Sequence, residues 1–112
     1  MRLAALHPAA LLRTVSALAV LLAAFSTNAQ VVPAPPKLGL CASCHGAGGI
    51  ATDKRIPNLA GQNLDYLRNA VAQYQSGARD VAAMRAASAM LSAAELDGVL
   101  QWYAAQVPER TP

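Results

Sequence analysis

Apolar positions recur at helical spacing in two segments of the chain and predict where its main helices lie. The first segment begins at Asn63, a favourable N-cap residue, and ends at Gly77, the residue type preferred just after a helix. One face of this segment collects its apolar side chains: Leu64, Leu67, Ala70, Val71 and Tyr74. A helix is therefore expected between Asn63 and Gly77.

The second segment begins at Ser92, which forms the pattern of a capping box with Glu95. Its apolar face carries Leu96, Val99, Leu100 and Tyr103, and Pro108 marks its end. Residues 78–91, between the two segments, are rich in alanine and favour helix by propensity, but they are also expected to wrap a bound group. Their structure stays open at this point.

The region before Asn63 contains one short predicted helix between segments rich in proline and glycine, which disfavour helix. Residues 30–36 contain three prolines and predict an extended lead-in, and residues 37–45 can form a short helix. The glycines at 46, 48 and 49 end that helix, and residues 50–62 predict a loop. No segment alternates like a strand, so the prediction is an all-α domain with about three main helices.

The first 29 residues have the pattern of a cleaved secretory signal peptide. Arg2 and Arg13 precede an apolar run over residues 15–25, and small residues at 27–29 predict cleavage after Ala29. The alternative is a retained anchor, but the run is shorter than the roughly 20 residues that a membrane span needs. The predicted organisation is a signal peptide (1–29), a Pro-rich lead-in (30–36), one domain (37–107) and a C-terminal tail (108–112).

Removal of the leader changes the charge. The whole chain has nine Lys and Arg and six Asp and Glu, and loss of Arg2 and Arg13 leaves seven against six, a net charge of +1. No basic run interleaved with aromatic residues occurs, so nucleic-acid binding is excluded. Cleavage would also leave no membrane span.

Two thiols and an imidazole stand together in the order Cys41, Ala42, Ser43, Cys44, His45. The two sulfur atoms lie about one helical turn apart, so both can form thioethers with the two vinyl groups on one edge of a haem. The imidazole of His45 then lies under the porphyrin as the proximal iron ligand. We therefore predict one haem c, attached through Cys41 and Cys44, which also supplies the core that so short a chain needs.

Three other interpretations of the motif fit less well. A thioredoxin-type redox pair needs a βαβ context, and no strand-like run flanks the cysteines. A structural zinc site needs four ligands, and no Cys or His follows His45. A disulfide would close too short a loop to stabilise much. Haem also agrees with the signal peptide, because c-type haem is attached outside the bacterial cytoplasm.

The opposite face of the iron has few possible ligands. Outside the leader they are Met84, Met90, Lys37, Lys54 or no protein group at all. A thioether sulfur suits haem iron and raises its reduction potential, yet methionine in an alanine-rich segment is also ordinary core filling. The residues by themselves leave this choice open.

The chain resembles the small class I c-type cytochromes of bacterial periplasms. This group includes the halves of dihaem electron carriers and the cytochrome subunit of flavocytochrome sulfide dehydrogenase. The similar stretches are Cys41–Gly46, Ile56–Gln62, Tyr66–Leu67, Ser76–Arg79, Met84, Leu91–Ser92 and Trp102–Ala104. The resemblance implies a small class I cytochrome c fold around one covalently bound haem.

The resemblance also implies the sixth ligand. The family's methionine lies five residues after an arginine and eight before the serine that caps the last helix, which is the place of Met84 between Arg79 and Ser92. Met90 matches no ligand position, so its expected role is packing. The iron ligands implied are therefore His45 and Met84.

Three further residues take cofactor-binding roles by resemblance. The carbonyl of Pro57 is expected to accept the second ring N–H of His45. Leu59 is expected to press on a haem face, with core packing as the alternative, and Arg79 to pair with a haem propionate, with an exposed charge as the alternative. Core packing is expected of Trp102 and Tyr103. The family's first helix is usually longer, so its contact with the last helix is expected to be weak here.

With both axial positions filled, no substrate can reach the iron. The predicted function is a periplasmic one-electron carrier, not an enzyme, that exchanges electrons with unidentified redox partner proteins. The alternative is an electron-accepting haem c subunit in a stable periplasmic oxidoreductase complex, such as a sulfur-compound dehydrogenase. A third hypothesis, a haem sensor or peroxidase-like enzyme, requires an empty sixth position.

Overall fold

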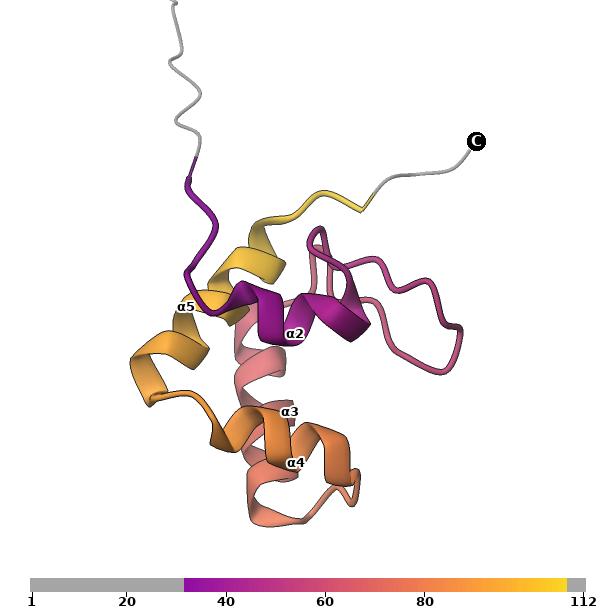
Figure 1. Ribbon diagram of the computed structural model, residues 1–112, viewed down its shortest axis with the longest axis vertical. Helices are drawn as coiled ribbons and strands as arrows, with labels where there is room; N and C mark the ends of the chain where they lie inside the picture. Colours follow the sequence, from indigo (N-terminus) through magenta and orange to yellow (C-terminus); the bar gives the residue numbers. More distant parts are fainter. Residues whose placement is uncertain (1–31, 109–112) are drawn as a thin grey trace, which may run out of the picture. The chain divides into compact units, whose positions relative to one another are not determined.

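The computed structural model describes residues 32–108, and this part of the chain is all-helical (Figure 1). It contains four helices and no strand: α2 (Leu38–His45), α3 (Leu64–Ser76), α4 (Ala82–Ala89) and α5 (Ala93–Ala105). The all-α prediction is confirmed. About three main helices were expected, and the fourth in residues 32–108 is α4, which forms in the segment whose structure was left open. The predicted signal peptide and the tail after Pro108 lie outside the described residues.

Side-chain caps define the starts of α3 and α5, and a glycine ends α3, as the sequence predicts. The side chain of Asn63 accepts a hydrogen bond from the backbone N–H of Tyr66 at 3.0 Å, and Gly77 ends α3 with a φ of +81°. At the start of α5, the N–H of Ser92 donates to Glu95 Oε2 at 2.9 Å and the N–H of Glu95 donates to Ser92 Oγ at 3.2 Å. These caps satisfy backbone groups that a helix end otherwise leaves without partners.

The alanine-rich segment forms α4 without a side-chain cap. Its sheltered face carries Met84, Ala87 and Ser88, and Leu91 follows them at the same helical spacing. The other positions of α4 are exposed. Helix propensity therefore prevails over the expectation of an irregular wrapping segment.

The core lies where α3 meets α5 and where α2 and the turn before α5 pack against them. Its buried members are Leu38, Leu67, Val71, Leu91, Val99, Leu100 and Tyr103. The closest helix neighbours of α3 are α4 and α5, whereas α2 has only eight residues and contributes Leu38 as its one buried core residue. The expected weak contact of a short first helix agrees with this arrangement.

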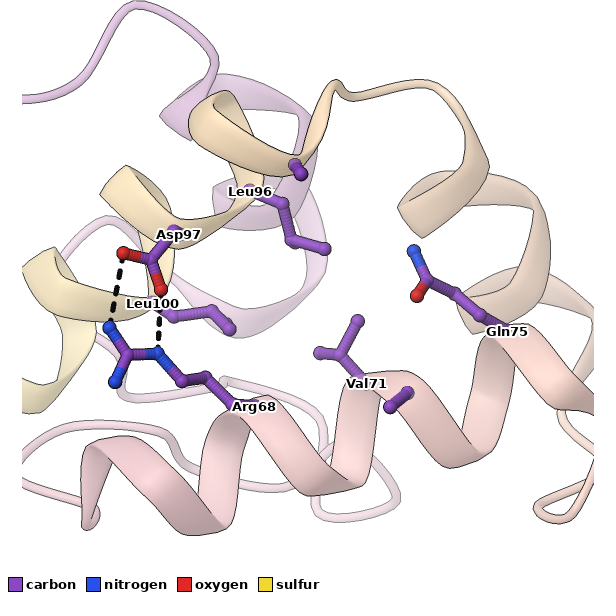
Figure 2. Close-up of a pocket in the computed structure, with 8 residues that line it drawn as sticks. Arg68, Val71, Gln75, Leu96, Asp97 and Leu100 are labelled. Atoms are coloured by element: carbon purple, nitrogen blue, oxygen red, sulfur yellow. Dashed lines mark hydrogen bonds and ion pairs between the residues drawn. The ribbon is translucent and has the colours of Figure 1, made fainter.

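A shallow groove of about 230 Å³ lies along α3 and α5 (Figure 2). Val71 of α3 and Leu96 and Leu100 of α5 line it with apolar side chains. At one edge, Arg68 donates two hydrogen bonds to the carboxylate of Asp97, at 2.7 and 3.1 Å, and joins the two helices. Neither Cys41 nor Cys44 lines this groove, and neither does His45. The groove is therefore separate from the predicted haem-attachment motif.

Candidate functional site

Helix α2 carries the two thiols and the imidazole of the motif. Cys41 is half-buried against the core, Cys44 is exposed, and the thiols are not bonded to each other. Burial raises the pKa of the Cys41 thiol. The two cysteines therefore form no disulfide with each other, and both sulfur atoms can form thioethers.

His45 ends α2 and is only 6% exposed. Its Nδ1 lies 2.9 Å from the carbonyl oxygen of Pro57, so the expected bond between these two residues is present. Because a carbonyl can only accept, Nδ1 carries the proton and Nε2 keeps the lone pair that a metal ligand needs. Nε2 makes no hydrogen bond within residues 32–108. Because every fully buried side-chain nitrogen and oxygen in that range has a partner, Nε2 is not fully buried and reaches the molecular surface.

The loop between α2 and α3 folds back on itself beside His45. The carbonyl of Gly49 accepts hydrogen bonds from the N–H of Leu59 at 2.8 Å and of Ala60 at 3.1 Å. Gly49 has a φ of +80°, and a Cβ there would lie 2.6 Å from the nitrogen of Ala60. Only glycine permits this close approach, which brings the Pro57 segment back toward the end of α2.

Helix α5 holds the same loop through two aromatic side chains. The hydroxyl of Tyr103 donates to the carbonyl of Gly46 at 2.9 Å, and Trp102 Nε1 donates to the carbonyl of Ala47 at 2.8 Å. Tyr103 is fully buried, in agreement with the expected core packing, but the two hydrogen bonds were not predicted. The partners are 57 and 55 residues apart, and no sequence pattern signals a bond to a loop carbonyl at that separation.

The two methionines of the described chain differ in exposure. Met84 is half-buried on the inward face of α4, together with Ala87 and Ser88. Met90 is 69% exposed, so the expectation that it packs is wrong. It follows the end of α4 and is out of phase with the inward face, whereas the next residue, Leu91, is in phase with that face and buried. Met84 is the methionine that the fold shelters.

Arg79 lies against α3 and is not a freely solvated charge. Its Nε donates to Gln73 Oε1 at 2.7 Å, and its guanidinium carbon lies 5.5 Å from the ring centre of Tyr74 and 5.9 Å from that of Tyr66. The hydroxyl groups of Tyr66 and Tyr74 raise the pKa of Arg79. The pairing of Arg79 with a propionate stays a prediction.

The remaining predicted residues occupy ordinary positions. Leu59 is half-buried and packs against the core, while Lys37 and Lys54 are exposed. Within residues 32–108, no three side chains of His, Cys, Asp or Glu converge to hold a metal ion by themselves. In the same range, no helix combines the length and apolar character that a membrane crossing requires.

Two curated proteins are similar to the chain, and no family model matches it. The thiosulfate dehydrogenase electron acceptor of Thiomonas intermedia (strain K12) is 35% identical over 103 residues, which cover 90% of this chain and 48% of that protein. Cytochrome c4 of Pseudomonas aeruginosa is 33% identical over 70 residues, which cover 62% of this chain and 35% of that protein. These two relatives support a class I c-type cytochrome.

Haem c is the cofactor of these cytochromes, and the residues of this chain fit it. Two cysteines that form no disulfide lie on one short helix, which ends in a buried imidazole whose Nε2 has no protein partner within residues 32–108 and can bind iron. It also shelters one thioether, that of Met84. The cytochrome spans about half the length of the first relative and about a third of the second.

Proposed function

We propose that this cytochrome carries single electrons in the periplasm, with haem c bonded to Cys41 and Cys44 and its iron held by His45 and Met84. The observation that carries this proposal is the buried imidazole of His45, which follows the second thiol directly and bonds through Nδ1 to Pro57. A structural histidine would not need this combination of a fixed ring and a free Nε2.

The two proposed iron ligands, His45 and Met84, suit electron exchange more than catalysis. A bound haem c supplies one-electron exchange between its ferric and ferrous states. The Nδ1–H of His45 donates a hydrogen bond to the carbonyl of Pro57, which makes Nε2 more basic and would favour the ferric state of a bound haem. The thioether of Met84 favours the ferrous state and raises the reduction potential. With both ligands bound, no position is left for a substrate, so the cytochrome is itself no enzyme.

Other side chains support the cofactor from the protein side. Ile50 is 44% exposed and Val81 46% exposed, and both belong to segments that flank the proposed ligands. A haem has two apolar faces that need cover, and these residues and Leu59 supply apolar surface for it. Arg79 carries a positive charge outside the four ion pairs of the described residues, which suits a propionate.

The periplasmic location follows from the leader. Residues 1–29 have the n-region, apolar run and small residues of a signal peptide. Export also places the cysteines where c-type haem is attached. The mature charge near zero implies little long-range steering of partners, so docking depends on short-range contacts.

A stable complex with an oxidoreductase is the second candidate. The relative from Thiomonas intermedia is named as the electron acceptor of thiosulfate dehydrogenase, and this name favours a sulfur-compound dehydrogenase as the electron donor. In that complex the cytochrome would accept electrons and contribute no substrate site. The short α2, with its few helix contacts, agrees with a partner that supports the domain.

A redox titration of the secreted protein tests electron carriage. We expect a reversible transition with one electron per haem and a reduced form that does not bind carbon monoxide. Rapid carbon monoxide binding by the wild-type protein would instead favour a sensor or peroxidase-like protein. Affinity purification from a periplasmic extract then separates the two candidates, because a lone red protein indicates a free carrier and a co-purifying flavin or molybdenum enzyme indicates a subunit.

A further inference from the structure

Tyr103 holds the loop between α2 and α3 at two places. Its hydroxyl donates to the carbonyl of Gly46, at 2.9 Å, and its own backbone carbonyl accepts from the N–H of Gly61 at 3.0 Å. One contact lies directly after His45 and the other lies four residues after Pro57. The two partners of the imidazole hydrogen bond are thus both tied to one residue of α5.

The ring of Tyr103 also packs against Gly49, near the start of this loop. A Cβ at Gly49 would lie 3.0 Å from Tyr103 Cδ1, so the ring lies against bare backbone there. Gly49 in turn accepts the hydrogen bonds that fold residues 59 and 60 back. Tyr103 is 0% exposed, and its position is therefore set by close packing on all sides.

We propose that Tyr103 is a positioning residue for the proximal ligand: through Gly46 it fixes the distance between His45 Nδ1 and the carbonyl of Pro57, and so tunes the reduction potential of the cytochrome. The inference rests on the proposed function, because it requires His45 to be an iron ligand. Trp102 assists through its hydrogen bond to Ala47, one residue further along the loop.

The direction of the effect follows from the chemistry of the imidazole. A short Nδ1–H···O=C bond increases electron density at Nε2, which stabilises the ferric state and lowers the potential. Loss of the Tyr103 hydroxyl frees Gly46 and lets the His45 ring move relative to Pro57. The bond then weakens on average, so the potential rises and the Nδ1 proton exchanges faster with water.

The test compares Tyr103→Phe with Val99→Ala in the haem-loaded protein. Val99 is also on α5 and fully buried, but it makes no side-chain hydrogen bond to the loop, so its variant controls for lost stability. For Tyr103→Phe we expect a raised midpoint potential and about tenfold faster exchange of the His45 Nδ1 proton, measured by NMR, as the loss of one hydrogen bond predicts. For Val99→Ala we expect neither change.

Two results would overturn the inference. One is a Tyr103→Phe protein whose midpoint potential and His45 Nδ1 proton exchange equal those of wild type. The other is a Val99→Ala protein in which the potential and the exchange rate change as much as in Tyr103→Phe. If Tyr103→Phe fails to fold, Trp102→Phe takes its place, and we again expect a raised midpoint potential and faster exchange of the His45 Nδ1 proton. A Trp102→Phe protein with wild-type values of both also counts against the inference. A wild-type chain without covalent haem contradicts the proposed function itself, whereas a silent variant of the haem-loaded protein contradicts only the role of Tyr103.

Discussion

Ser92 and Glu95 exchange hydrogen bonds at the start of α5, at 2.9 and 3.2 Å, and this pair fixes where the last helix begins. We expect Ser92→Ala to lower the free energy of unfolding by about 1 kcal/mol, because an N–H of the first turn loses its acceptor. Urea unfolding measures the change. Ser92→Thr keeps the acceptor and is expected to stay close to wild type, and an equal loss in both variants would argue against the cap.

Gly49 and Gly48 provide a matched pair in the loop beside His45. Gly49→Ala combines a positive φ with a Cβ that lies 2.6 Å from the nitrogen of Ala60, so we expect a loss of at least about 1–2 kcal/mol. A Cβ at Gly48 would have no atom within 4 Å, and Gly48→Ala should stay within about 0.5 kcal/mol of wild type. The comparison fails if the two substitutions cost the same in urea unfolding.

The hydroxyl of Tyr103 predicts a loss of stability at alkaline pH. Burial raises the pKa of Tyr103 from 10.0 to about 12, so the folded state holds this proton more tightly than the unfolded chain. The protonated hydroxyl of Tyr103 therefore contributes fully to the stability of the folded state below pH 10. This contribution is lost as the pH rises from 10 toward 12. Urea unfolding across this range should show the decline in wild type and a smaller one in Tyr103→Phe, and parallel declines would contradict the assignment.

Met84 and Met90 should respond differently to removal. Met84→Ala takes away the sheltered thioether, so we expect a lower reduction potential and carbon monoxide binding to the reduced protein. Met90 is 69% exposed, and Met90→Ala is expected to leave the potential and the spectrum unchanged. Unchanged spectra of Met84→Ala, or opening of the iron in Met90→Ala, would exclude Met84 as the ligand.

Local signals predicted the ends of the helices well. Asn63, Gly77 and the pair Ser92 and Glu95 act through neighbours three or four residues away, so their roles can be identified without the fold. The bond between His45 and Pro57 was expected only through the resemblance to a family, because its partners are twelve positions apart in the sequence. The sequence by itself carries no signal for such a closure.

Local sequence signals left the structure of residues 78–91 open. Its alanines favour helix, but Val81 gives no side-chain cap, so neither the start of α4 nor its inward face was predicted. Once α4 begins at Ala82, the phase of the helix shelters Met84 and exposes Met90. The bonds from Trp102 and Tyr103 to the loop were missed for another reason, because they depend on how distant backbone folds.

The central claim is a haem bonded to Cys41 and Cys44, and mass spectrometry of one peptide tests it most directly. Trypsin cleavage after Lys37 and Lys54 releases residues 38–54, which contain both cysteines and His45. In protein secreted by a host with cytochrome-maturation machinery, we predict that this peptide carries the added mass of one haem and that Cys41→Ala with Cys44→Ala removes it. A wild-type peptide with two unmodified thiols would contradict the account.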